Sequence, residues 1–402
     1  MDITAQTTPV AVTRIVVIGG GYAGTMAANR LAGQAGTDVV LLNARPHFVD
    51  RIRLHQWAAD TGSAGHEYST LLGDGVRLVV GTAERIDTAR RRVVLASGDE
   101  LPYDRLVYAV GSTARIPTGL VRPDAAGSEH AFTVGEWESA QRLREHLKTE
   151  RGAVTVVGGG LTGAETAAEL AERGLSVRLV CDGPLVPAFG DRGRRATARG
   201  LDRLGVRVFE NLRVTAIGPR SISVAGANGD EEWPSATTIV AAGFAVPRLA
   251  ADSGLTTDPD GRLVTDETLT SVDDPRIVGA GDAVAPSNTP LRMSCQAANP
   301  MGLHAADTVI AAMNNRPAQP IRIGFSGQNL SLGRRAAVIQ LSHTDDTPRS
   351  LVLRGRIAGA IKEQVCRFVI RGIGLEARRP GLMRGVSRKP RTADELAQTV
   401  LR

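Results

Sequence analysis

Two stretches of the chain repeat one order of apolar and polar positions. The first begins with a short apolar run, residues 15–18, which predicts a buried strand. A glycine turn follows with the spacing G-x-G-x-x-G, formed by Gly19, Gly21 and Gly24. Residues 25–34 then predict a short helix, and the apolar run that ends at Asn43 predicts a second strand. A strand, a glycine turn, a helix and a second strand form the βαβ unit that binds a dinucleotide.

The second stretch has the same order. Residues 153–157 predict a strand, residues 164–174 a helix and residues 175–180 another strand. The glycine turn between the first strand and the helix consists of Gly158, Gly160 and Gly163. A single such turn is weak evidence, because glycine-rich turns occur for many reasons. Two of them, each between a strand and a helix, predict two dinucleotide sites, with the helix N-termini facing the phosphates.

The residue that ends the second strand of each unit normally carries the acid that binds a ribose hydroxyl. Asn43 takes that position in the first unit, and Cys181 followed by Asp182 takes it in the second. Without an acid in the slot, the extra phosphate of NADPH is not repelled. Four arginines are candidates for binding such a phosphate: Arg178, Arg192, Arg194 and Arg195. The choice between NADH and NADPH therefore stays open.

From about residue 317 the pattern changes. Residues 321–325, 336–342 and 350–355 predict short strands, and residues 356–372 predict a helix. Five apolar residues follow one face of that helix: Ile357, Ile361, Val365, Phe368 and Val369. We favour packing of this face on the sheet, with the arginines solvated. The alternative is weak peripheral contact of the basic helix and the Arg-rich tail, residues 377–391, with an anionic bilayer.

Composition and charge narrow the classes of protein to which the chain can belong. A length of 402 residues suits two or three domains, and an aromatic content of 3% argues against a stacking surface for nucleic acid. The net charge is +6, but residues 350–402 hold twelve basic and four acidic side chains, so about −2 remains elsewhere. The three cysteines have no metal-ligand or disulfide spacing, so we expect no metal. We find no signal peptide and no apolar run of membrane-spanning length. We therefore expect a cytoplasmic protein, or one that lies peripherally on the inner face of the membrane.

At this point the chain resembles the FAD-dependent pyridine nucleotide oxidoreductases, flavoproteins with two dinucleotide-binding domains. Three further segments match that pattern in order: DRLVYAVGS (104–112), TTIVAAGFAVP (237–247) and RIVGAGDAV (276–284). The resemblance implies that Asp282 holds the ribitol chain of FAD. It also implies an α/β fold with two Rossmann-like domains, the NAD(P) domain inserted in the FAD domain, and a C-terminal α+β domain. The boundaries we expect are 12–112 and 243–316 for the FAD domain, 113–242 for the NAD(P)H domain, and 317–402 for the C-terminal domain.

These motifs give the cofactor-binding residues that we expect. For FAD they are Gly19, Gly21, Tyr22, Ala23, Gly24, Asn43, Ala109, Gly111, Gly243, Gly281 and Asp282. For NADH or NADPH they are Gly158, Gly160, Leu161, Thr162, Gly163 and Asp182.

The chain has no cysteine before Cys181, so it lacks the redox cysteines that disulfide reductases and related peroxidases carry after the first βαβ unit. Within the family, the chain is therefore similar to the type II NADH dehydrogenases and the apoptosis-inducing-factor-like quinone reductases. GGGLTGAETAAELAE matches their nucleotide motif, and MSCQAANPMG falls where they carry A-Q-x-x-x-Q. There Gln296 fits, whereas Cys295 and Pro300 depart from the pattern.

Four side chains are candidates for catalysis. The resemblance implies that Glu165 lies near the nicotinamide and the flavin, although an acid in a first helical turn also complements the helix dipole. Gln296 is a candidate contact of the flavin or acceptor, or a turn-stabilising amide. His47 and His55 are candidate proton donors, because histidine titrates near neutral pH, or hydrogen-bonded structural residues.

A predicted helix with Asn299 as its N-cap and Pro300 as its first residue would place a positive dipole end beside the flavin pyrimidine ring. Cys295 we interpret as a small buried hydrophobic residue rather than a reactive thiol.

The sequence thus predicts an enzyme that passes a hydride from NAD(P)H to FAD and then electrons to a quinone or another small acceptor. Two alternatives stay open: an NAD(P)H-dependent reductase of a ferredoxin or rubredoxin, and a slow flavin redox sensor. The basic tail would suit an acidic redox protein. In the family the C-terminal domain often builds a dimer or acceptor surface, so a homodimer is a further expectation.

Overall fold

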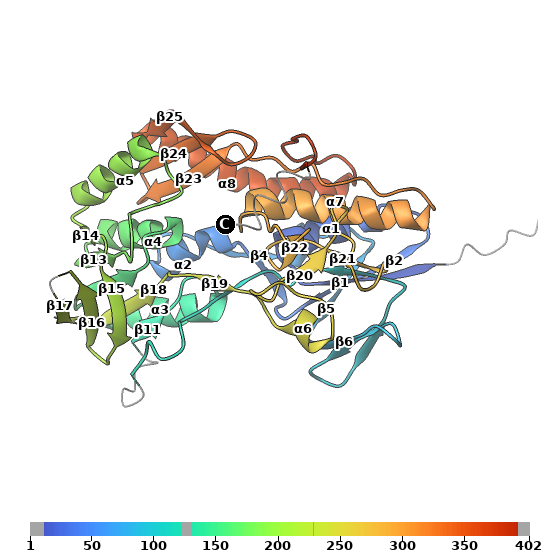
Figure 1. Cartoon of the computed structure of the whole chain (residues 1–402), viewed down its shortest axis with the longest axis horizontal. Coiled ribbons are helices and arrows are strands. Elements are labelled where there is room, and N and C mark those ends of the chain that lie inside the picture. Colours follow the sequence, from blue (N-terminus) through green and yellow to red (C-terminus); the bar gives the residue numbers. More distant parts are fainter. Residues whose placement is uncertain (1–11, 123–129, 228, 393–402) are drawn as a thin grey trace, which may run out of the picture.

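The structure is a computed structural model that describes residues 12–122, 130–227 and 229–392. Two parallel sheets lie side by side, and a smaller antiparallel sheet with a long helix lies across both (Figure 1). This is the α/β architecture predicted from the sequence.

The first Rossmann unit is a five-stranded parallel sheet with the order β21-β9-β1-β2-β5. Its strands are β1 (Thr13–Ile18), β2 (Thr37–Asn43), β5 (Val76–Val80), β9 (Arg105–Tyr108) and β21 (Ile277–Gly279). The inner strands are apolar runs because both faces of a parallel sheet are covered. Helix α1 (Tyr22–Ala32) links β1 to β2, and helix α7 (Cys295–Met313) packs closely on α1. A Cβ at Gly302 of α7 would stand 2.1 Å from the carbonyl oxygen of Ala23, so only glycine permits this approach.

The second unit repeats this design with the order β11-β18-β12-β13-β14. Its strands are β11 (Ala131–Phe132), β12 (Val154–Val157), β13 (Val177–Val180), β14 (Arg207–Phe209) and β18 (Thr237–Val240). Its helices are α3 (Trp137–Thr149), α4 (Leu161–Glu172) and α5 (Asp191–Arg203). The chain leaves the first unit through β10 (Thr113–Ala114) and returns through β19 (Phe244–Ala245), and these two strands pair antiparallel. The second unit is therefore inserted between β9 and β21 of the first.

Both units carry additional short strands and helices. The first carries the antiparallel sheet β6 (Ala83–Asp87), β7 (Arg92–Leu95) and β8 (Glu100–Pro102), and the second carries β15 (Arg213–Ile217), β16 (Ser221–Gly226) and β17 (Gly229–Pro234). Two pairs, β3 (His47–Val49) with β4 (Gly65–Glu67) and β20 (Leu263–Thr265) with β22 (Val284–Pro286), and the short helices α2 (Leu54–Ala58) and α6 (Leu249–Asp252) complete the two units.

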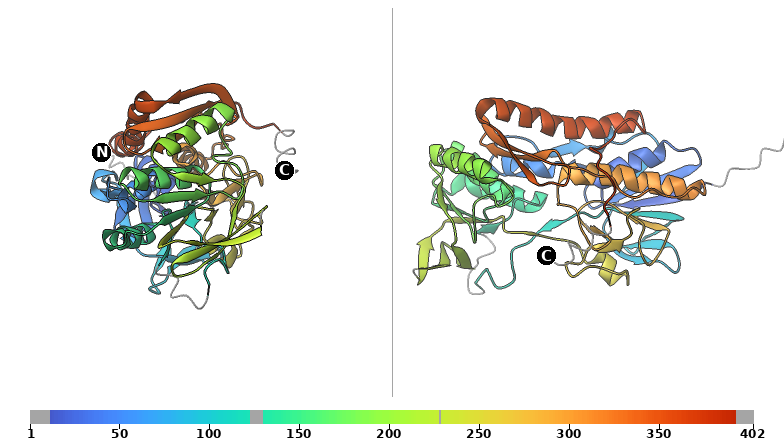
Figure 2. Two further views of the ribbon diagram at one scale, coloured as in Figure 1. Left: turned by 90° about the vertical axis from the view of Figure 1, so that its left-hand side faces the viewer. Right: turned by 45° about the horizontal axis from the view of Figure 1, so that its top comes forward.

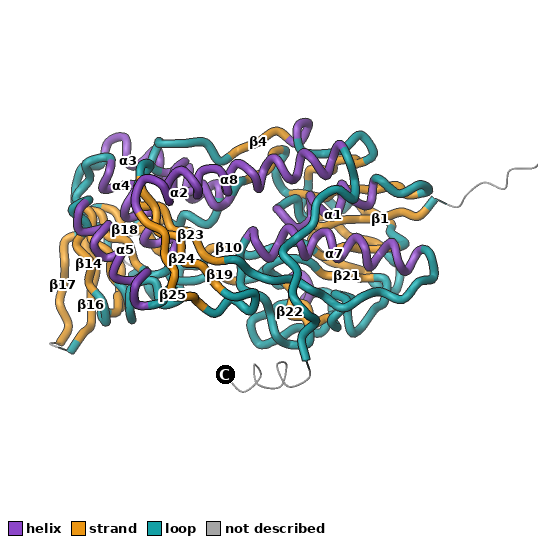
Figure 3. The backbone as a smooth tube through the Cα atoms, turned by 90° about the horizontal axis from the view of Figure 1, so that it is seen from above, coloured by secondary structure: helices purple, strands orange, loops and turns teal. Residues whose placement is uncertain are grey.

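The C-terminal part consists of β23 (Gly327–Leu332), β24 (Ala336–Ser342), β25 (Pro348–Arg354) and helix α8 (Gly355–Arg378). At about 1.5 Å per residue, the 24 residues of α8 reach about 36 Å. The helix packs on β24 near its start and on α1 further along, and its Lys362 pairs with Glu165 of α4, so it contacts both units (Figures 2 and 3). The predicted strand over 321–325 is reduced to a single bridge between Ile323 and Ser387.

The favoured interpretation of the apolar face of α8 is wrong for four of its five residues. Ile357 is 76% exposed and Phe368 is 58% exposed, and Ile361 and Val365 are exposed between them. Val369 is partly buried and packs on the core of the first unit.

Another side of the helix carries the packing, because it holds small residues that let the helix approach β24 closely, such as the buried Ala358 and Gly359, where a Cβ would stand 3.0 Å from the carbonyl oxygen of Arg335. Periodicity identified an apolar face but could not say what covers it. Among the described helices, α8 included, none combines the length and apolar content that a membrane span needs.

The Arg-rich tail is not simply solvated either. Arg391 forms an ion pair with Glu267 at 2.6 Å and donates hydrogen bonds to the carbonyl oxygens of Thr289 and Pro286. The chain after α8 is thereby tied back to the first unit, and this part of the basic surface is already paired.

Candidate active site

The two glycine turns have the same backbone geometry. Gly19 and Gly158 both have positive φ angles, +101° and +118°. A Cβ at Gly19 would lie 2.3 Å from the carbonyl oxygen of Ala109, and a Cβ at Gly158 would lie 2.5 Å from that of Ala241. The third glycines pack equally tightly, because a Cβ at Gly24 or Gly163 would come within 1.9 Å of the carbonyl oxygen of the first glycine. Both turns therefore require glycine at the same positions and for the same reasons.

The middle glycines, Gly21 and Gly160, differ from the others because they face open space. Among the described atoms, none lies within 4 Å of a Cβ built at either position. Each is the N-cap of its helix, α1 or α4, and no described side chain caps the free N–H groups there. These two helix ends fit a pyrophosphate, which accepts hydrogen bonds from free N–H groups and is attracted by the positive end of the helix dipole.

The residues expected to bind the flavin half of FAD lie together at the carboxyl ends of β9 and β21. Gly111 and Gly281 have positive φ angles, and Ser112 donates a hydrogen bond to Asp282 at 2.7 Å. Arg51 donates to the hydroxyl of Ser112 at 3.0 Å and lies 3.8 Å from Asp282. Sequence reasoning missed Arg51, because only the fold brings it to these strand ends.

Arg51 also reaches the second unit, where it donates to the carbonyl oxygen of Gly135 at 3.1 Å, and it lies 5.5 Å from the ring centroid of Phe244 on the returning strand β19. Gly243 precedes this phenylalanine and has a φ of +146°. Arg51 therefore marks the junction of the two units.

Tyr22 is buried, and its hydroxyl donates to Asp50 at 2.5 Å. Burial raises the pKa of this tyrosine well above its usual value. Asp50 is fully buried, 3.5 Å from Arg53 and 3.8 Å from His66. The Tyr22 side chain thus belongs to an internal polar cluster, and at the helix tip it contributes backbone.

The residues that follow or end the second strand of each unit, Asn43 in the first and Cys181 with Asp182 in the second, have different surroundings. Asn43 accepts a hydrogen bond from the N–H of Gly20 at 2.9 Å and donates to the carbonyl oxygen of Arg45 at 2.8 Å, so it fixes the first glycine turn. Cys181 is buried, whereas Asp182 is exposed and ion-paired with Arg213.

The four candidate arginines have separate environments. Arg178 donates to the carbonyl oxygen of Pro234 and lies over Trp233. Arg194 lies 3.8 Å from Glu210, and Arg192 and Arg195 are exposed on α5.

Glu165 lies in a buried ion pair with Lys362 of α8. Lys362 donates to the carboxylate and, at 3.1 Å, to the carbonyl oxygen of Asn329, and the N–H of Ser331 donates to Glu165 at 2.9 Å. Burial opposes ionisation of Glu165, but the charge and hydrogen bond of Lys362, with smaller contributions from His55 and Ser331, keep its pKa below the usual value. Helix α4 begins at Leu161, so Glu165 opens the second turn, and the alternative role of complementing the helix dipole in a first turn is wrong.

Lys362 was missed, although the sequence offered a signal. The chain has three lysines against 45 arginines (48 basic residues in all), and one of the three falls in the middle of the amphipathic helix.

The two candidate histidines have different surroundings. His55 is buried, and burial lowers its pKa to about 4, although the charge of Glu165 opposes this shift. The premise that it titrates near neutral pH is therefore wrong. His47 packs edge-on against Trp137, with ring centroids 4.8 Å apart.

Gln296 lies in the first turn of α7, where its amide donates to Ser326 at 2.6 Å. The predicted start of this helix is wrong by five residues. Ser294 is the N-cap and accepts from the N–H of Ala297 at 3.2 Å, whereas Pro300 lies inside the helix. Serine is as good an N-cap as asparagine, and proline was given too much weight as a start signal. Burial raises the pKa of Cys295 to about 12, so its thiol is not activated.

Comparison with known proteins agrees with this architecture. The chain is 32% identical over 386 residues to a NADH dehydrogenase-like protein of Mycobacterium tuberculosis, covering 88% of this chain and 93% of the relative. It is 28% identical to the type II NADH:quinone oxidoreductase NdhA of the same organism, covering 82% of this chain and 78% of the relative.

Two solved structures share the fold. The sulfide:quinone oxidoreductase of Aquifex aeolicus superposes with a TM-score of 0.76 at 19% identity, covering 95% of this chain and all of that chain. NDH2 of Plasmodium falciparum in complex with NADH gives 0.74 at 16% identity, covering 92% and 99%. The family described as pyridine nucleotide-disulphide oxidoreductase matches residues 13–302. The chain belongs to this family, and it is an oxidoreductase.

Proposed function

We propose that the protein is an FAD-dependent NAD(P)H:quinone oxidoreductase. The observation that carries the proposal is the pair of glycine turns with matching geometry, which offers two helix ends to two pyrophosphates. Bound FAD would supply a ring that takes a hydride at N5 from nicotinamide C4 and releases electrons one or two at a time. The family's pyridine nucleotide chemistry supports the use of NAD(P)H.

The first unit is the one we assign to FAD. Gly21 at the tip of α1 would hold the pyrophosphate, and Asp282 and Arg51 would hold the ribitol side. Gly160 at the tip of α4 would hold the pyrophosphate of NADH or NADPH. The corresponding domains are 12–112 with 243–316, 113–242, and 317–402.

Glu165 is best described as a positioning residue. Its carboxylate joins α4 to the N–H of Ser331 on β23 and to Lys362 on α8. The pair therefore holds the nicotinamide unit against the C-terminal part of the chain. Gln296, next to Ser326 at the start of α7, would contact the flavin or the acceptor.

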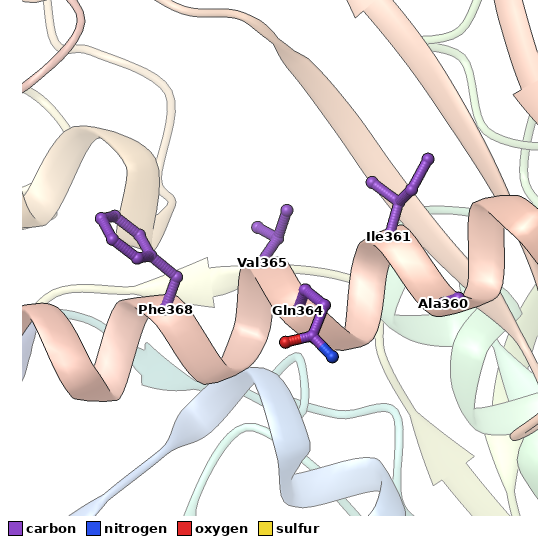
Figure 4. Close-up of a pocket in the computed structure, with 5 residues that line it drawn as sticks. All are labelled: Ala360, Ile361, Gln364, Val365 and Phe368. Carbon is purple, nitrogen blue, oxygen red and sulfur yellow. The ribbon is translucent and has the colours of Figure 1, made fainter.

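A quinone is the acceptor that the surface supports best. The exposed apolar face of α8, defined by Ile357, Ile361, Val365 and Phe368, continues along about three turns, and Figure 4 shows Ile361, Val365 and Phe368 on one side of the helix. Exposed Arg356, Arg367 and Arg371 lie on the same helix. Such a combination favours an anionic bilayer, where lipid-soluble quinones reside. The relatives NdhA and the demethylphylloquinone reductase NdbB of Synechocystis carry quinone reduction in their names.

Two assays test the proposal. Steady-state turnover of the purified flavoprotein with NADH should be fast with a soluble quinone such as menadione. Turnover that requires added ferredoxin would contradict it. In liposome flotation, anionic vesicles should carry the wild type but not Phe368→Glu. Flotation of neither protein would restrict the proposal to a soluble acceptor.

A further inference from the structure

The segment between Asp282 and α7 begins and ends against the tip of α1. A Cβ built at Gly281 would stand 3.2 Å from the Cβ of Ala23, and one at Gly302 of α7 would stand 2.1 Å from the carbonyl oxygen of the same alanine. Ala23 lies in the first turn of α1, two residues after the N-cap Gly21. The chain thus leaves this helix tip at Gly281 and returns to it through α7. We call residues 283–294, which join the two contacts, the connecting segment.

The connecting segment contains a strained turn. After β22 ends at Pro286, Ser287 and Asn288 have φ angles of +51° and +57°. Two consecutive non-glycine residues in this left-handed region are unfavourable unless the surroundings hold them there. The N–H of Thr289 donates to the carbonyl oxygen of Pro286 at 2.9 Å, and its hydroxyl donates to the same oxygen at 3.0 Å. These bonds close the turn from within.

Arg391 clamps the same turn from outside. Its guanidinium donates to the carbonyl oxygens of Pro286 at 3.0 Å and Thr289 at 2.7 Å, so it spans both ends of the turn. It also donates to both carboxylate oxygens of Glu267, at 3.1 and 2.6 Å. The planar fork of an arginine can serve all of these acceptors at once, whereas the ammonium of a lysine is a single point charge. The side chain is only 10% exposed.

The chain that carries Arg391 is held along its path from α8. The carbonyl oxygen of Met383 accepts from Arg30 of α1 at 2.7 Å. A Cβ at Gly385 would stand 2.6 Å from the side chain of Pro300, so the chain crosses α7 in close contact. The N–H of Gly324 then donates to the carbonyl oxygen of Val386 at 2.8 Å. Segments near a chain end are poorly ordered unless they are tied down in this way.

A second anchor holds the far end of the connecting segment. Arg292 donates to Asp346, between β24 and β25, at 2.5 and 3.1 Å, and lies 4.7 Å from the ring centroid of Phe325. Its guanidinium also donates to the amide oxygen of Gln296 at 3.4 Å. The C-terminal part of the chain therefore holds the connecting segment at the turn and again just before α7.

We infer that Arg391 is a positioning residue for the flavin. By clamping the turn at residues 286–289, it fixes the segment that joins Asp282 to Gln296. This inference rests on the proposed function, in which the first unit binds FAD, Asp282 holds the ribitol side, and Gln296 contacts the flavin or the acceptor. Arg391 acts through the connecting segment, because a shift of the turn moves both of these residues against the tip of α1.

The test measures the release of FAD from the loaded protein, followed by the rise of flavin fluorescence after dilution. Arg391→Gln should speed release about tenfold, which corresponds to the loss of one hydrogen bond from a charged donor. Arg391→Lys should release FAD nearly as fast, because a lysine can pair with Glu267 but cannot hold both carbonyl oxygens. Glu267→Gln should have a smaller effect, because Arg391 keeps its bonds to the turn. Hydrogen exchange at the amide of Thr289 should rise in the order of these release rates.

The matched control is Arg262→Gln, which breaks another partly buried ion pair of the first unit. The side chains of Arg262 and Asp258 are 17% and 6% exposed, and Asp258 lies outside the connecting segment. This variant should lower the unfolding midpoint without speeding the release of FAD.

Three results would overturn the inference while leaving the proposed oxidoreductase intact: release from Arg391→Gln at the wild-type rate, equal acceleration in Arg262→Gln, or a wild-type rate in Arg391→Lys. A wild type that binds no FAD would overturn the inference and the proposed function together.

Discussion

Replacing Lys362 by methionine should cost the protein more stability than any other lysine substitution. The side chains of Lys362 and Glu165 are each 11% exposed, and they join α8 to α4. Removing one partner of a buried ion pair leaves an uncompensated charge, which costs about 3–5 kcal/mol. The matched control is Lys148→Met, because Lys148 pairs with Glu145 but both side chains are more than half exposed. An exposed pair contributes about 0–1 kcal/mol.

The pH dependence separates a lost charge partner from lost packing. In the wild type the pKa of Glu165 is lowered in the folded state, so its contribution is present above the unfolded value of about 4.3 and lost as pH falls through the folded value. Without Lys362 burial dominates, and the folded pKa should rise above the unfolded value. The carboxyl can then take up a proton, so the stability deficit of Lys362→Met should be smaller at pH 5 than at pH 8.

Urea unfolding followed by circular dichroism at both pH values measures these differences. Adding Glu165→Gln to Lys362→Met should restore most of the loss, since the buried charge is gone. A loss below 1 kcal/mol at pH 8, or equal losses at pH 5 and pH 8, would refute the reasoning.

Three further predictions concern the nucleotide sites. Gly160→Ala should keep the fold, because its φ of −74° and open surroundings accept a Cβ, but should weaken ADP-ribose binding about tenfold in calorimetry; an unchanged affinity would remove the pyrophosphate from this helix end. Gly158→Ala, by contrast, should lower the unfolding midpoint, because its φ is +118° and the Cβ would meet the carbonyl oxygen of Ala241; a midpoint equal to that of Gly160→Ala would contradict this distinction. Arg51→Gln should lose flavin on gel filtration more readily than Arg51→Lys, since the charge lies beside Asp282; equal retention would show that the charge is not used.

Much of the fold follows from local sequence. The glycine turns were predictable because positive φ angles and sub-van-der-Waals approaches at Gly19 and Gly158 exclude every other residue. The buried strands were predictable because a parallel sheet covered on both faces needs continuous apolar runs. The family resemblance, built on these motifs, was confirmed.

The contacts between distant segments were not predictable. The ion pair of Glu165 joins residues 197 positions apart, and Arg51 meets Asp282 across the insertion of a whole unit. The exposed face of α8 was assigned wrongly for a related reason. Periodicity places Ile357 and Phe368 on one side, but the choice of packed side depends on the small residues on another side of the helix. Whether Gln296 and His47 act in catalysis stays a prediction.

The central claim is that two folded units present a flavin and a nicotinamide to each other, and one anaerobic titration tests it. The purified chain should be yellow, release FAD on denaturation, and lose its absorbance near 450 nm with about one equivalent of NADH. A colourless protein that does not take up FAD, or a bound flavin that stays oxidised with both NADH and NADPH, would contradict the account.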